Sequence, residues 1–398
     1  MDCVRTAGGR RGGSLSGWHP VDLGAQVIDA LVTRGKFPGE LVDDVVFGCV
    51  DQIGAQAGNI GRLVVLASKS LPESVPGVTV DRQCGSGQQA IHFAAQAVMS
   101  GTQDVVIAGG VEIMSLVPIG SNVFDGMKNG RGVPNSPALT AKYKLKDPLF
   151  SQFNGAETVA EKYEISREEM EKFALLSHKR AAEATRAGKF ESEILPITGI
   201  NPKITDSVVL KHDEGIRWPT SLDKLKSLPT LKSGGRLTAA TASQITDGAA
   251  AVLICNEQGL KKLGLKPRAK IVSMALAGTD PVSMLTGPIP ASEKALKKLS
   301  KSINDIDLYE VNEAFACVPL AWAKALQADI KKLNVNGGAI ALGHPLGATG
   351  AKLMTTLVNE LEKRRGRYGL LAICEGGGTA NATIIERIDS ASNATSKL

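Results

Sequence analysis

The chain has 398 residues, with 43% hydrophobic residues, 43 glycines and only 4% aromatic residues. This length exceeds one ordinary hydrophobic core, so we expect about two or three domains, and the apolar content excludes a disordered chain. The formal charge of +6 is spread along the chain with no basic block interleaved with aromatic residues, which argues against nucleic-acid binding.

Strand and helix patterns alternate through the first hundred residues. Pro20 opens a helical apolar pattern that ends at Gly35. The patterns that follow predict a strand over 45–47, a helix within 59–70, a strand ending at Val80 and a buried strand over 104–110. This alternation is typical of an α/β fold, and we expect a mostly parallel sheet with helices on both faces.

The strand that ends at Val80 leads directly to Cys84, which is followed by glycines and a helical pattern of small residues. A cysteine at the start of a helix lies near the positive end of the helix dipole, which favours a thiolate. The same stretch is equally compatible with a buried core cysteine, because free cysteines are among the most buried residues.

The composition of the sequence changes between residues 116 and 243, where Gly, Asn, Pro and Lys become frequent and patterns typical of long strands are no longer found. One helix is clearly marked, because Ser166 and Glu169 form a capping box before an apolar helical pattern. We interpret this region as an inserted, loop-rich domain, which is where binding sites are commonly built.

An apolar run typical of a buried strand in an α/β fold returns at residues 249–254. Residues 332–336 then read as a strand that enters a glycine elbow and a helix, before the buried strand 370–373. This order repeats that of residues 78–108, so we expect two similar halves related by pseudo-twofold symmetry.

Chemistry-bearing residues concentrate in three motifs of the second half: Asn312-Glu313-Ala314-Phe315, Gly343-His344-Pro345 and Cys374-Glu375-Gly376-Gly377-Gly378. Together with Cys84 they suit acyl transfer that makes or breaks a carbon–carbon bond. His344 would take the thiol proton of Cys84, and Cys374 would act as acid and base on the carbon next to a thioester. The thioester oxygen becomes negative at each step, and N–H groups near Gly376, with His344 and Asn312, are the candidate donors.

The remaining cysteines and histidines carry no such pattern. No CxxC pair occurs, so the sequence predicts no metal site. We expect the other histidines to lie on the surface or on helix faces: His19, His92, His178 and His212.

These motifs resemble those of the thiolases, the acetyl-CoA C-acyltransferases, and the resemblance covers essentially the whole chain. It implies duplicated βαβαβαββ halves in a layered α-β-α-β-α core with an inserted loop domain. The implied boundaries are an N-terminal half of 1–115 plus 245–266, an insertion of 116–244 that binds coenzyme A, a C-terminal half of 267–389 and a flexible tail of 390–398.

The resemblance also implies a ping-pong reaction on acyl-CoA substrates, without a tightly bound cofactor. Cys84 would attack the 3-keto carbon, acetyl-CoA would leave after Cys374 protonates it, and coenzyme A would remove the acyl group. One oxyanion hole would use His344 and a water held by Asn312, and the other would use the N–H groups of Cys84 and Gly376.

The family resemblance also implies which residues contact coenzyme A, within the insertion and near it. The turn containing Ala242 and Ser243 is similar to the pantetheine-binding turn of the family, with Phe315 as a further contact. Arg217 falls where the family places a basic residue near the nucleotide, although a solvated arginine is an equally good interpretation. Lys224 stands where the family commonly has a serine.

The sequence also departs from short-chain biosynthetic thiolases, which carry His-Met-Gly where this chain has Ser151-Gln152-Phe153. This favours a degradative 3-ketoacyl-CoA thiolase of fatty-acid β-oxidation, with an acetoacetyl-CoA thiolase as the alternative. A ketoacyl synthase would need a histidine at Asn312 and usually lacks the second cysteine. An inactive lipid-binding or scaffolding relative is the alternative from a different class.

The chain ends in Ser396-Lys397-Leu398, a tripeptide read by the peroxisomal import receptor. We find no secretory signal and no apolar run of about 20 residues, so we expect reduced thiols and no membrane span. The resulting expectation is an enzyme of the peroxisomal matrix. The family resemblance adds a homodimer, with a tetramer as the alternative, and an N-terminus that lacks most of the first strand.

Overall fold

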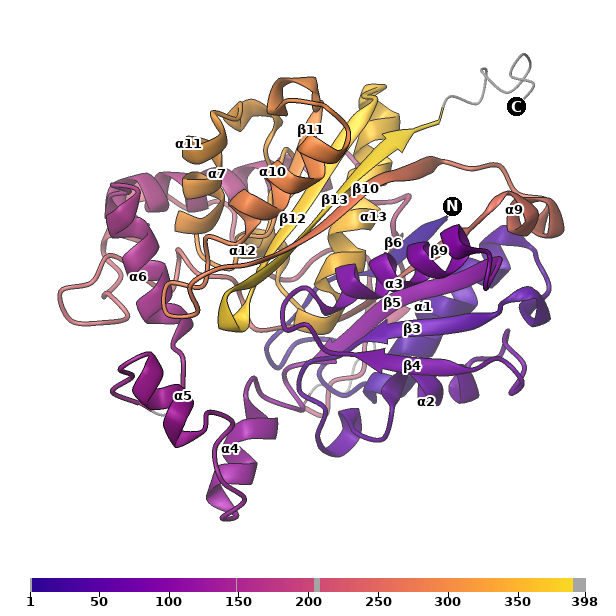
Figure 1. Cartoon of the computed structure of the whole chain (residues 1–398), viewed down its shortest axis with the longest axis horizontal. Helices are drawn as coiled ribbons and strands as arrows, with labels where there is room; N and C mark the ends of the chain where they lie inside the picture. The colour runs from indigo at the N-terminus through magenta and orange to yellow at the C-terminus, as the bar shows by residue number, and fades with distance from the viewer. Residues whose placement is uncertain (1, 148, 204–207, 389–398) are drawn as a thin grey trace.

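Figure 1 shows the computed structural model, which describes residues 2–147, 149–203 and 208–388. The first of its sheets runs in the order β4 (Gly77–Val80), β3 (Asp44–Gly48), β5 (Val105–Ile113), β9 (Thr246–Cys255), β1 (Cys3–Thr6) and β6 (Ile194–Leu195), with β2 (Gly9–Arg10) also on β9. The second runs in the order β10 (Ala269–Gly278), β13 (Thr379–Arg387), β12 (Tyr368–Glu375) and β11 (Leu308–Val311).

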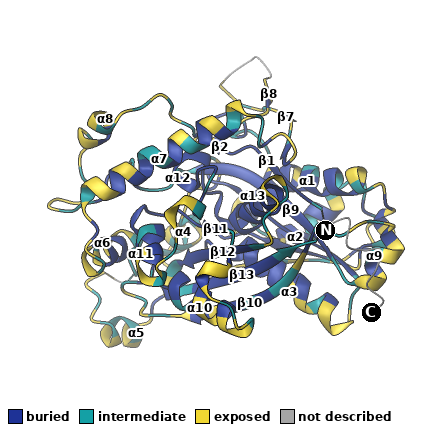
Figure 2. Ribbon diagram, turned by 90° about the horizontal axis from the view of Figure 1, so that it is seen from above, coloured by how far each residue is buried: buried dark blue, intermediate teal, exposed yellow. Residues whose placement is uncertain are grey.

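Two helices lie between the sheets, α3 (Ser86–Ser100) and α13 (Thr349–Arg364), and their inner residues share one hydrophobic cluster with both sheets. Alternation along the strands explains this layer: on β5, Val106 and Ala108 face α3, whereas Val105 and Ile107 face the outer helices. Those outer helices are α1 (Pro20–Gly35) and α2 (Ile60–Ala67). On the outer face of the second sheet lie α10 (Pro288–Lys298) and α11 (Cys317–Leu326). The burial colours of Figure 2 follow these layers.

The two halves repeat one strand arrangement. In the first sheet β3 and β5 are parallel, and β9 runs antiparallel to both β5 and β1. In the second, β11 and β12 are parallel, and β13 runs antiparallel to both β12 and β10. The expected duplication in an α-β-α-β-α fold is therefore confirmed. The expectation of mostly parallel sheets is wrong, because β9 and β13 return in the opposite direction.

The strand expected over 332–336 is also wrong. A single parallel bridge, between Tyr309 and Leu333, joins this segment to β11 at the place where β4 pairs with β3 in the first half. Asn334 interrupts the ladder because its φ is +45° and its side chain takes over the pairing. Its amide accepts from the N–H of Val311 at 2.9 Å and donates to the carbonyl of Val311 at 2.9 Å.

The described part of the region between β5 and β9 contains β6, which pairs with β1, and the following helices and short strands: α4 (Ser121–Lys128), α5 (Pro137–Lys142), α6 (Gln152–Lys162), α7 (Arg167–Arg186), α8 (Leu222–Lys226), β7 (Ile197–Thr198) and β8 (Val209–Leu210). The capping box of Ser166 and Glu169 at the start of α7 is confirmed. In Figure 1, α4 and α5 lie apart from the sheets, and neither helix contains a buried residue. After this region β9 returns to the first sheet between β5 and β1.

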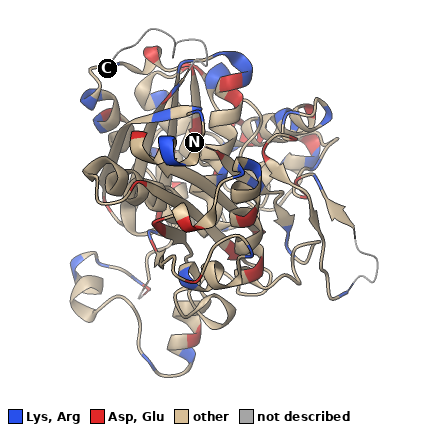
Figure 3. Ribbon diagram, turned by 90° about the vertical axis from the view of Figure 1, so that its right-hand side faces the viewer, with Lys and Arg blue, Asp and Glu red and all other residues tan. Residues whose placement is uncertain are grey.

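Charged residues of both signs are interspersed over the face shown in Figure 3. The lysines of α10 are exposed: Lys294, Lys297 and Lys298. No helix in the described part of the chain is long and apolar enough to cross a membrane. Among the same residues, no group of three or more His, Cys, Asp or Glu side chains is arranged to hold a metal ion.

Candidate active site

Cys84 lies in a tight turn between β4 and α3. The turn is closed by Ser86, whose hydroxyl accepts from the N–H of Arg82 at 2.9 Å and donates to the carbonyl of Gln83 at 2.6 Å. The backbone changes direction at Gln83, whose φ is +50°. The sequence folds this way because a β-branched strand meets small residues that allow a sharp entry into the helix.

The Cys84 side chain is 5% exposed, and burial raises the pKa of its thiol to about 12. The negative charge of Glu375 raises this pKa further, and a hydrogen bond from the Gln152 side chain lowers it. The expected preference for a thiolate is therefore wrong, because burial outweighs the helix terminus. Cys84 is a protonated thiol at neutral pH, and a base must take its proton when the sulfur attacks.

His344 lies at the end of a turn that follows α12 (Ala339–Leu342). Gly343 has a φ of +83°, and a Cβ there would collide with Thr246, so the turn requires glycine. The N–H of His344 donates to the Thr246 hydroxyl at 3.0 Å. The imidazole Nδ1 lies 2.6 Å from the Thr349 hydroxyl, and the Asn312 amide nitrogen lies 3.3 Å from Nε2.

These contacts assign the tautomer of His344. The Thr349 hydroxyl donates to the carbonyl of Pro345 at 2.9 Å, so its oxygen accepts the Nδ1–H of His344. Nε2 then carries the lone pair and accepts from the Asn312 amide. Burial, helped by the charge of Lys352, lowers the pKa of His344 to about 3. The imidazole is therefore neutral, with Nε2 available to accept a proton.

The structure brings the other predicted catalytic residues to the same place. A Cβ on Gly87 or Gly350 would collide with the opposite helix start, so the N-terminal ends of α3 and α13 touch. A Cβ on Gly376 would lie 3.0 Å from the side chain of Gln83, next to Cys84. Cys374, which is 1% exposed at the end of β12, lies close enough to Cys84 that the two thiols interact electrostatically.

Cys374 is also a protonated thiol. Burial raises its pKa well above the usual value, and negative charge on Cys84, Cys317 or Glu375 would raise it further. Glu375 follows it on the opposite face of β12, where burial raises the pKa of its carboxyl to about 8. The Thr379 hydroxyl donates to one Glu375 oxygen at 2.6 Å, and the other oxygen lies against Gly85.

A cavity of about 220 Å³ lies among α7, α8 and α12, and Arg217, Lys224 and Ala242 line it. Ser243 and Phe315 are not among the lining residues but lie next to it. Ala242 pairs with Phe315 in a β-bridge, and the N–H of Ser243 donates to Ala314 at 2.9 Å. Two exposed cations at one cavity suit a phosphorylated ligand.

Family models match almost the whole described chain: the thiolase N-terminal domain matches residues 1–258 and the thiolase C-terminal domain matches residues 265–387. The chain belongs to the thiolase family. The steroid 3-ketoacyl-CoA thiolase FadA6 of Mycobacterium tuberculosis is 56% identical to this thiolase over 98% of this chain and 93% of its own length.

Other relatives are more distant but equally complete. An acetyl-CoA acetyltransferase of Chromobacterium violaceum is 42% identical over 96% of this chain and 97% of its own length. A 3-ketoacyl-CoA thiolase of Salmonella typhimurium is 41% identical over 98% of each chain. The thiolase is thus an acyltransferase, and its relatives support a degradative role.

Two residues of the thiolase site, His178 and Gln152, were not predicted from the sequence, and His92, outside this site, was expected at the surface or on a helix face. His178, expected at a surface or helix face, is 5% exposed in α7, lines the 220 Å³ cavity and accepts the N–H of Arg217 at 3.1 Å. His92 is also buried, with Nε2 2.8 Å from the Thr383 hydroxyl. Gln152 was noted only as a departure from related sequences, yet its side chain contacts the Cys84 sulfur. None of these contacts leaves a local signal, because each joins distant segments.

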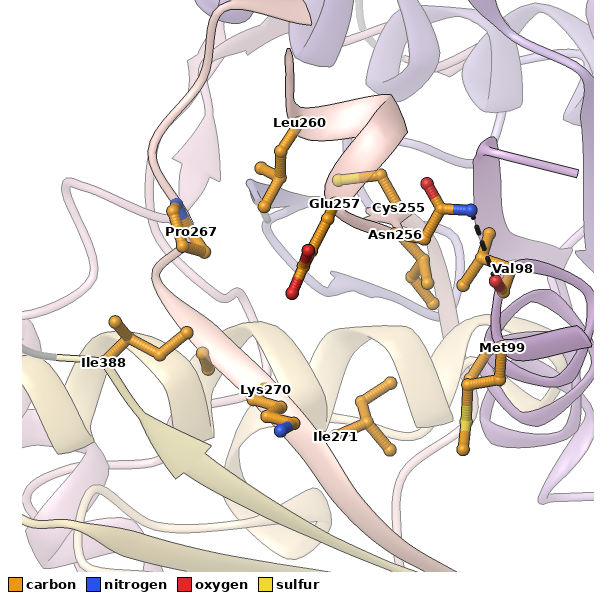
Figure 4. Close-up of a pocket in the computed structure, with 13 residues that line it drawn as sticks. Val98, Met99, Cys255, Asn256, Glu257, Leu260, Pro267, Lys270, Ile271 and Ile388 are labelled. Atoms are coloured by element: carbon orange, nitrogen blue, oxygen red, sulfur yellow. Dashed lines mark hydrogen bonds between the residues drawn. The ribbon is translucent and has the colours of Figure 1, made fainter. Parts of the chain in front are cut away.

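A second cavity of the thiolase, of about 520 Å³, is largely apolar and contains none of the predicted site residues. Figure 4 shows Val98 and Met99 of α3 on one side, with Cys255 and Lys270 from the region that joins the two halves. Val98 lies near the far end of α3 from Cys84, about 20 Å along the helix axis. This cavity therefore takes no part in the chemistry at Cys84.

Proposed function

We propose that this thiolase cleaves 3-ketoacyl-CoA with coenzyme A, giving acetyl-CoA and a shortened acyl-CoA. The observation that carries the proposal is the combination of two neighbouring buried thiols with a neutral imidazole. Cleavage of a carbon–carbon bond next to a thioester needs a nucleophile, a base for its proton and a separate acid for the leaving carbon. Cys84, His344 and Cys374 supply these three groups.

The first half of the reaction acylates Cys84. Its sulfur attacks the 3-keto carbon while its proton passes to Nε2 of His344. The bond between carbons 2 and 3 then breaks, and the electron pair on carbon 2 takes the proton of Cys374. Acetyl-CoA leaves, and the site now holds an acyl-Cys84 thioester, a Cys374 thiolate and a His344 imidazolium.

The second half restores the enzyme. The Cys374 thiolate takes the thiol proton of coenzyme A, whose sulfur attacks the Cys84 thioester. The tetrahedral intermediate collapses, the shortened acyl-CoA leaves, and His344 returns its proton to the Cys84 sulfur. The developing oxyanions would be stabilised by protonated His344 with Asn312, and by the N–H groups of Cys84 and Gly376.

Coenzyme A would occupy the 220 Å³ cavity as a substrate rather than as a tightly bound cofactor. Arg217 and Lys224 are the cations that would meet its phosphates, and His178 and Ala242 line the same space. The backbone pairing of Ala242 with Phe315 connects this cavity to the Asn312 motif, so a pantetheine arm could run from the cavity toward Cys84.

For the acyl group we propose a chain larger than acetoacetyl, including bulky ring-bearing groups. Gln152 contacts Cys84, and the next residue, Phe153, packs edge-to-face on Phe315 with ring centroids 5.5 Å apart. Phe153 is 53% exposed, so it offers apolar surface beside the nucleophile for a large acyl group. The name of the 56% identical relative, a steroid 3-ketoacyl-CoA thiolase, supports this substrate class.

Thiolysis rates for a series of substrates test the proposal. The purified full chain is assayed with acetoacetyl-CoA, a straight-chain 3-ketoacyl-CoA of medium length and a 3-ketoacyl-CoA bearing a steroid ring system. We expect the highest kcat/KM for one of the two larger substrates, and a Cys84→Ala variant without activity serves as the control. Activity confined to acetoacetyl-CoA would instead support the acetoacetyl-CoA thiolase that the 42% identical acetyltransferase represents.

We also propose a cellular location and an oligomeric state for the enzyme. The terminal Ser396-Lys397-Leu398 lies outside the described residues, so a peroxisomal address rests on that tripeptide alone. Fusion of residues 389–398 to a fluorescent protein tests it in peroxisome-containing cells, and a fusion lacking Leu398 is the control. The homodimer rests on the family, and light scattering of the full chain tests it.

A further inference from the structure

Lys352 lies on the first turns of α13 and is only 4% exposed. Its ammonium group donates to the carbonyl of Leu342 and, at 3.0 Å, to the carbonyl of Gly343. These are the two residues directly before His344. A buried lysine is costly unless it is paired and hydrogen-bonded, so two bonds to one catalytic turn indicate a specific purpose.

The surroundings of Lys352 explain how its charge is kept in the interior. Asp213 and Glu193 attract it, and Arg5 repels it. Arg5 is itself bound by Glu193 at 2.7 Å and by Asp213 at 2.8 Å, and these three side chains are at most 1% exposed. Two cations and two carboxylates thus form a balanced cluster.

The turn that carries His344 is held on its other sides by different segments. Thr246 of β9 binds the backbone N–H of His344, and Glu112 of β5 accepts the N–H of Gly347 at 2.9 Å. Lys352 is the described side chain that binds the two carbonyls on the N-terminal side of this turn. Its positive charge also acts on the imidazole, whose pKa it lowers after the larger effect of burial.

We propose that Lys352 is a positioning residue for the acyl-transfer reaction. It holds the carbonyls of Leu342 and Gly343 so that Nε2 of His344 faces the Cys84 thiol, and its charge favours the neutral imidazole. This inference rests on the role proposed above for His344. Lys352 touches neither the substrate nor the reacting atoms, and it acts through the His344 turn.

The charge has a consequence in each half of the reaction. Before attack, burial keeps Nε2 unprotonated and the charge of Lys352 adds to this effect, so the lone pair is free to take the thiol proton. After attack, it makes the imidazolium more acidic, so the proton returns readily to the Cys84 sulfur. Groups that face the imidazole from other elements are Thr349 and Asn312, both uncharged, so Lys352 is the charged group that acts on it.

The test compares Lys352→Met and Lys352→Gln with the wild-type full chain. Methionine removes both the hydrogen bonds and the charge, whereas glutamine can still donate to a carbonyl but is neutral. Thr355→Val is the matched control, because Thr355 is buried one turn later on α13 and its hydroxyl bonds to the carbonyl of Ala351 at 2.8 Å and to Cys3, away from the His344 turn. Thermal unfolding verifies that each variant is folded, and kcat/KM for thiolysis is measured from about pH 3 to 9, so that the profile reaches the low pKa of His344.

We expect Lys352→Met to lower kcat/KM at pH 7 by about 10- to 100-fold, because small misplacements of a base are costly. Both neutral variants should move the acid limb of the pH profile upward, since His344 protonates more easily without the nearby charge. Lys352→Gln should retain more activity than Lys352→Met at pH 8. Thr355→Val should stay within about two-fold of wild type with an unchanged profile, as expected for a substitution away from the site.

A folded Lys352→Met enzyme with wild-type kcat/KM and an unmoved acid limb would overturn the proposal. If both neutral variants fail to unfold cooperatively, Lys352→Arg becomes the test because it keeps the positive charge: we expect a folded Lys352→Arg enzyme to keep the acid limb of the wild type, and an acid limb that moves in this variant would also overturn the proposal. Absence of thiolysis in the wild-type enzyme would be a failure of the proposed function instead, and the two failures are therefore distinct.

Discussion

Nδ1 of His344 lies 2.6 Å from the hydroxyl oxygen of Thr349, and that hydroxyl in turn donates to the carbonyl of Pro345. The chain of bonds fixes the proton of the neutral imidazole on Nδ1 and the lone pair on Nε2. A residue five positions after the histidine therefore decides which ring nitrogen can serve as the base.

Replacement of Thr349 by valine keeps the size of the side chain but removes this acceptor. The imidazole can then rotate or take the other tautomer, and we expect kcat/KM for thiolysis to fall about 10- to 100-fold. Alkylation of Cys84 by iodoacetamide at pH 7 should slow in parallel. Thr349→Ser, which keeps the hydroxyl, is the control and should recover most of the activity. Equal rates for the valine and serine variants would contradict the assignment.

Assays of the partial reactions should distinguish the role of the Cys84 thiol from that of the Cys374 thiol. Exchange of labelled coenzyme A into an acyl-CoA needs attack and departure at Cys84 and a base for the coenzyme A thiol, but no protonation of carbon. We therefore expect Cys374→Ala to keep a slowed exchange but to lose thiolysis of 3-ketoacyl-CoA, whereas Cys84→Ala loses both. Mass spectrometry should detect an acylated Cys84 peptide in Cys374→Ala. An acyl group on residue 374 of the Cys84→Ala variant would reverse the assigned roles.

The sequence singles out Cys84, His344 and Cys374 because each stands in a glycine-rich elbow, and Asn312 because it directly follows a strand. In the structure the Asn312 amide lies next to the imidazole of His344, and Cys374 lies next to Cys84. The residues that hold these side chains in place have no such local sequence pattern. The contacts of Thr246 and Lys352 with the His344 turn depend on how β9 and α13 pack.

For the fold, too, the sequence predicts some features, such as buried strands, but not others, such as their direction. Apolar runs such as Val105–Ile113 mark buried strands but do not show strand direction, so the antiparallel placement of β9 could not be foreseen. Likewise, apolar residues around Leu333 suggested a strand that the positive φ of Asn334 prevents. No local pattern marks Arg5 as buried, and only the tertiary structure places it between Glu193 and Asp213.

Glu375 should control the reactivity of Cys84 at alkaline pH. Burial raises the pKa of its carboxyl to about 8, so the group is neutral at pH 7 and negative at pH 9. The negative charge disfavours the Cys84 thiolate. Below pH 7 we expect Glu375→Gln and wild type to be alkylated at similar rates, whereas above pH 8 the variant should react faster. Identical rates at pH 9 would show that the carboxylate does not act on the thiol.

The same carboxyl has a predictable effect on stability. Its folded pKa is raised above the unfolded value, so the folded state holds the proton more tightly and stability falls as pH rises from about 4.5 to 8. Glu375→Gln removes this loss. We expect the Tm of the variant, relative to wild type, to increase between pH 5 and pH 8. A constant difference in Tm would contradict the raised pKa.

Arg217 and Lys224 should bind coenzyme A through charge. Both line the 220 Å³ cavity and both are exposed, so each should contribute ~1 kcal/mol and its replacement by alanine should raise KM for coenzyme A about three- to ten-fold. The chemistry at Cys84 is unaffected, so kcat should change little. Because exposed charges are screened, the difference from wild type should shrink as salt rises from about 0.05 to 0.5 M. Lys226→Ala is the matched control, since Lys226 lies on the same helix but pairs with Glu168 at 3.6 Å outside the cavity. A salt-independent rise in KM, or an equal rise for Lys226→Ala, would place the phosphates of coenzyme A elsewhere.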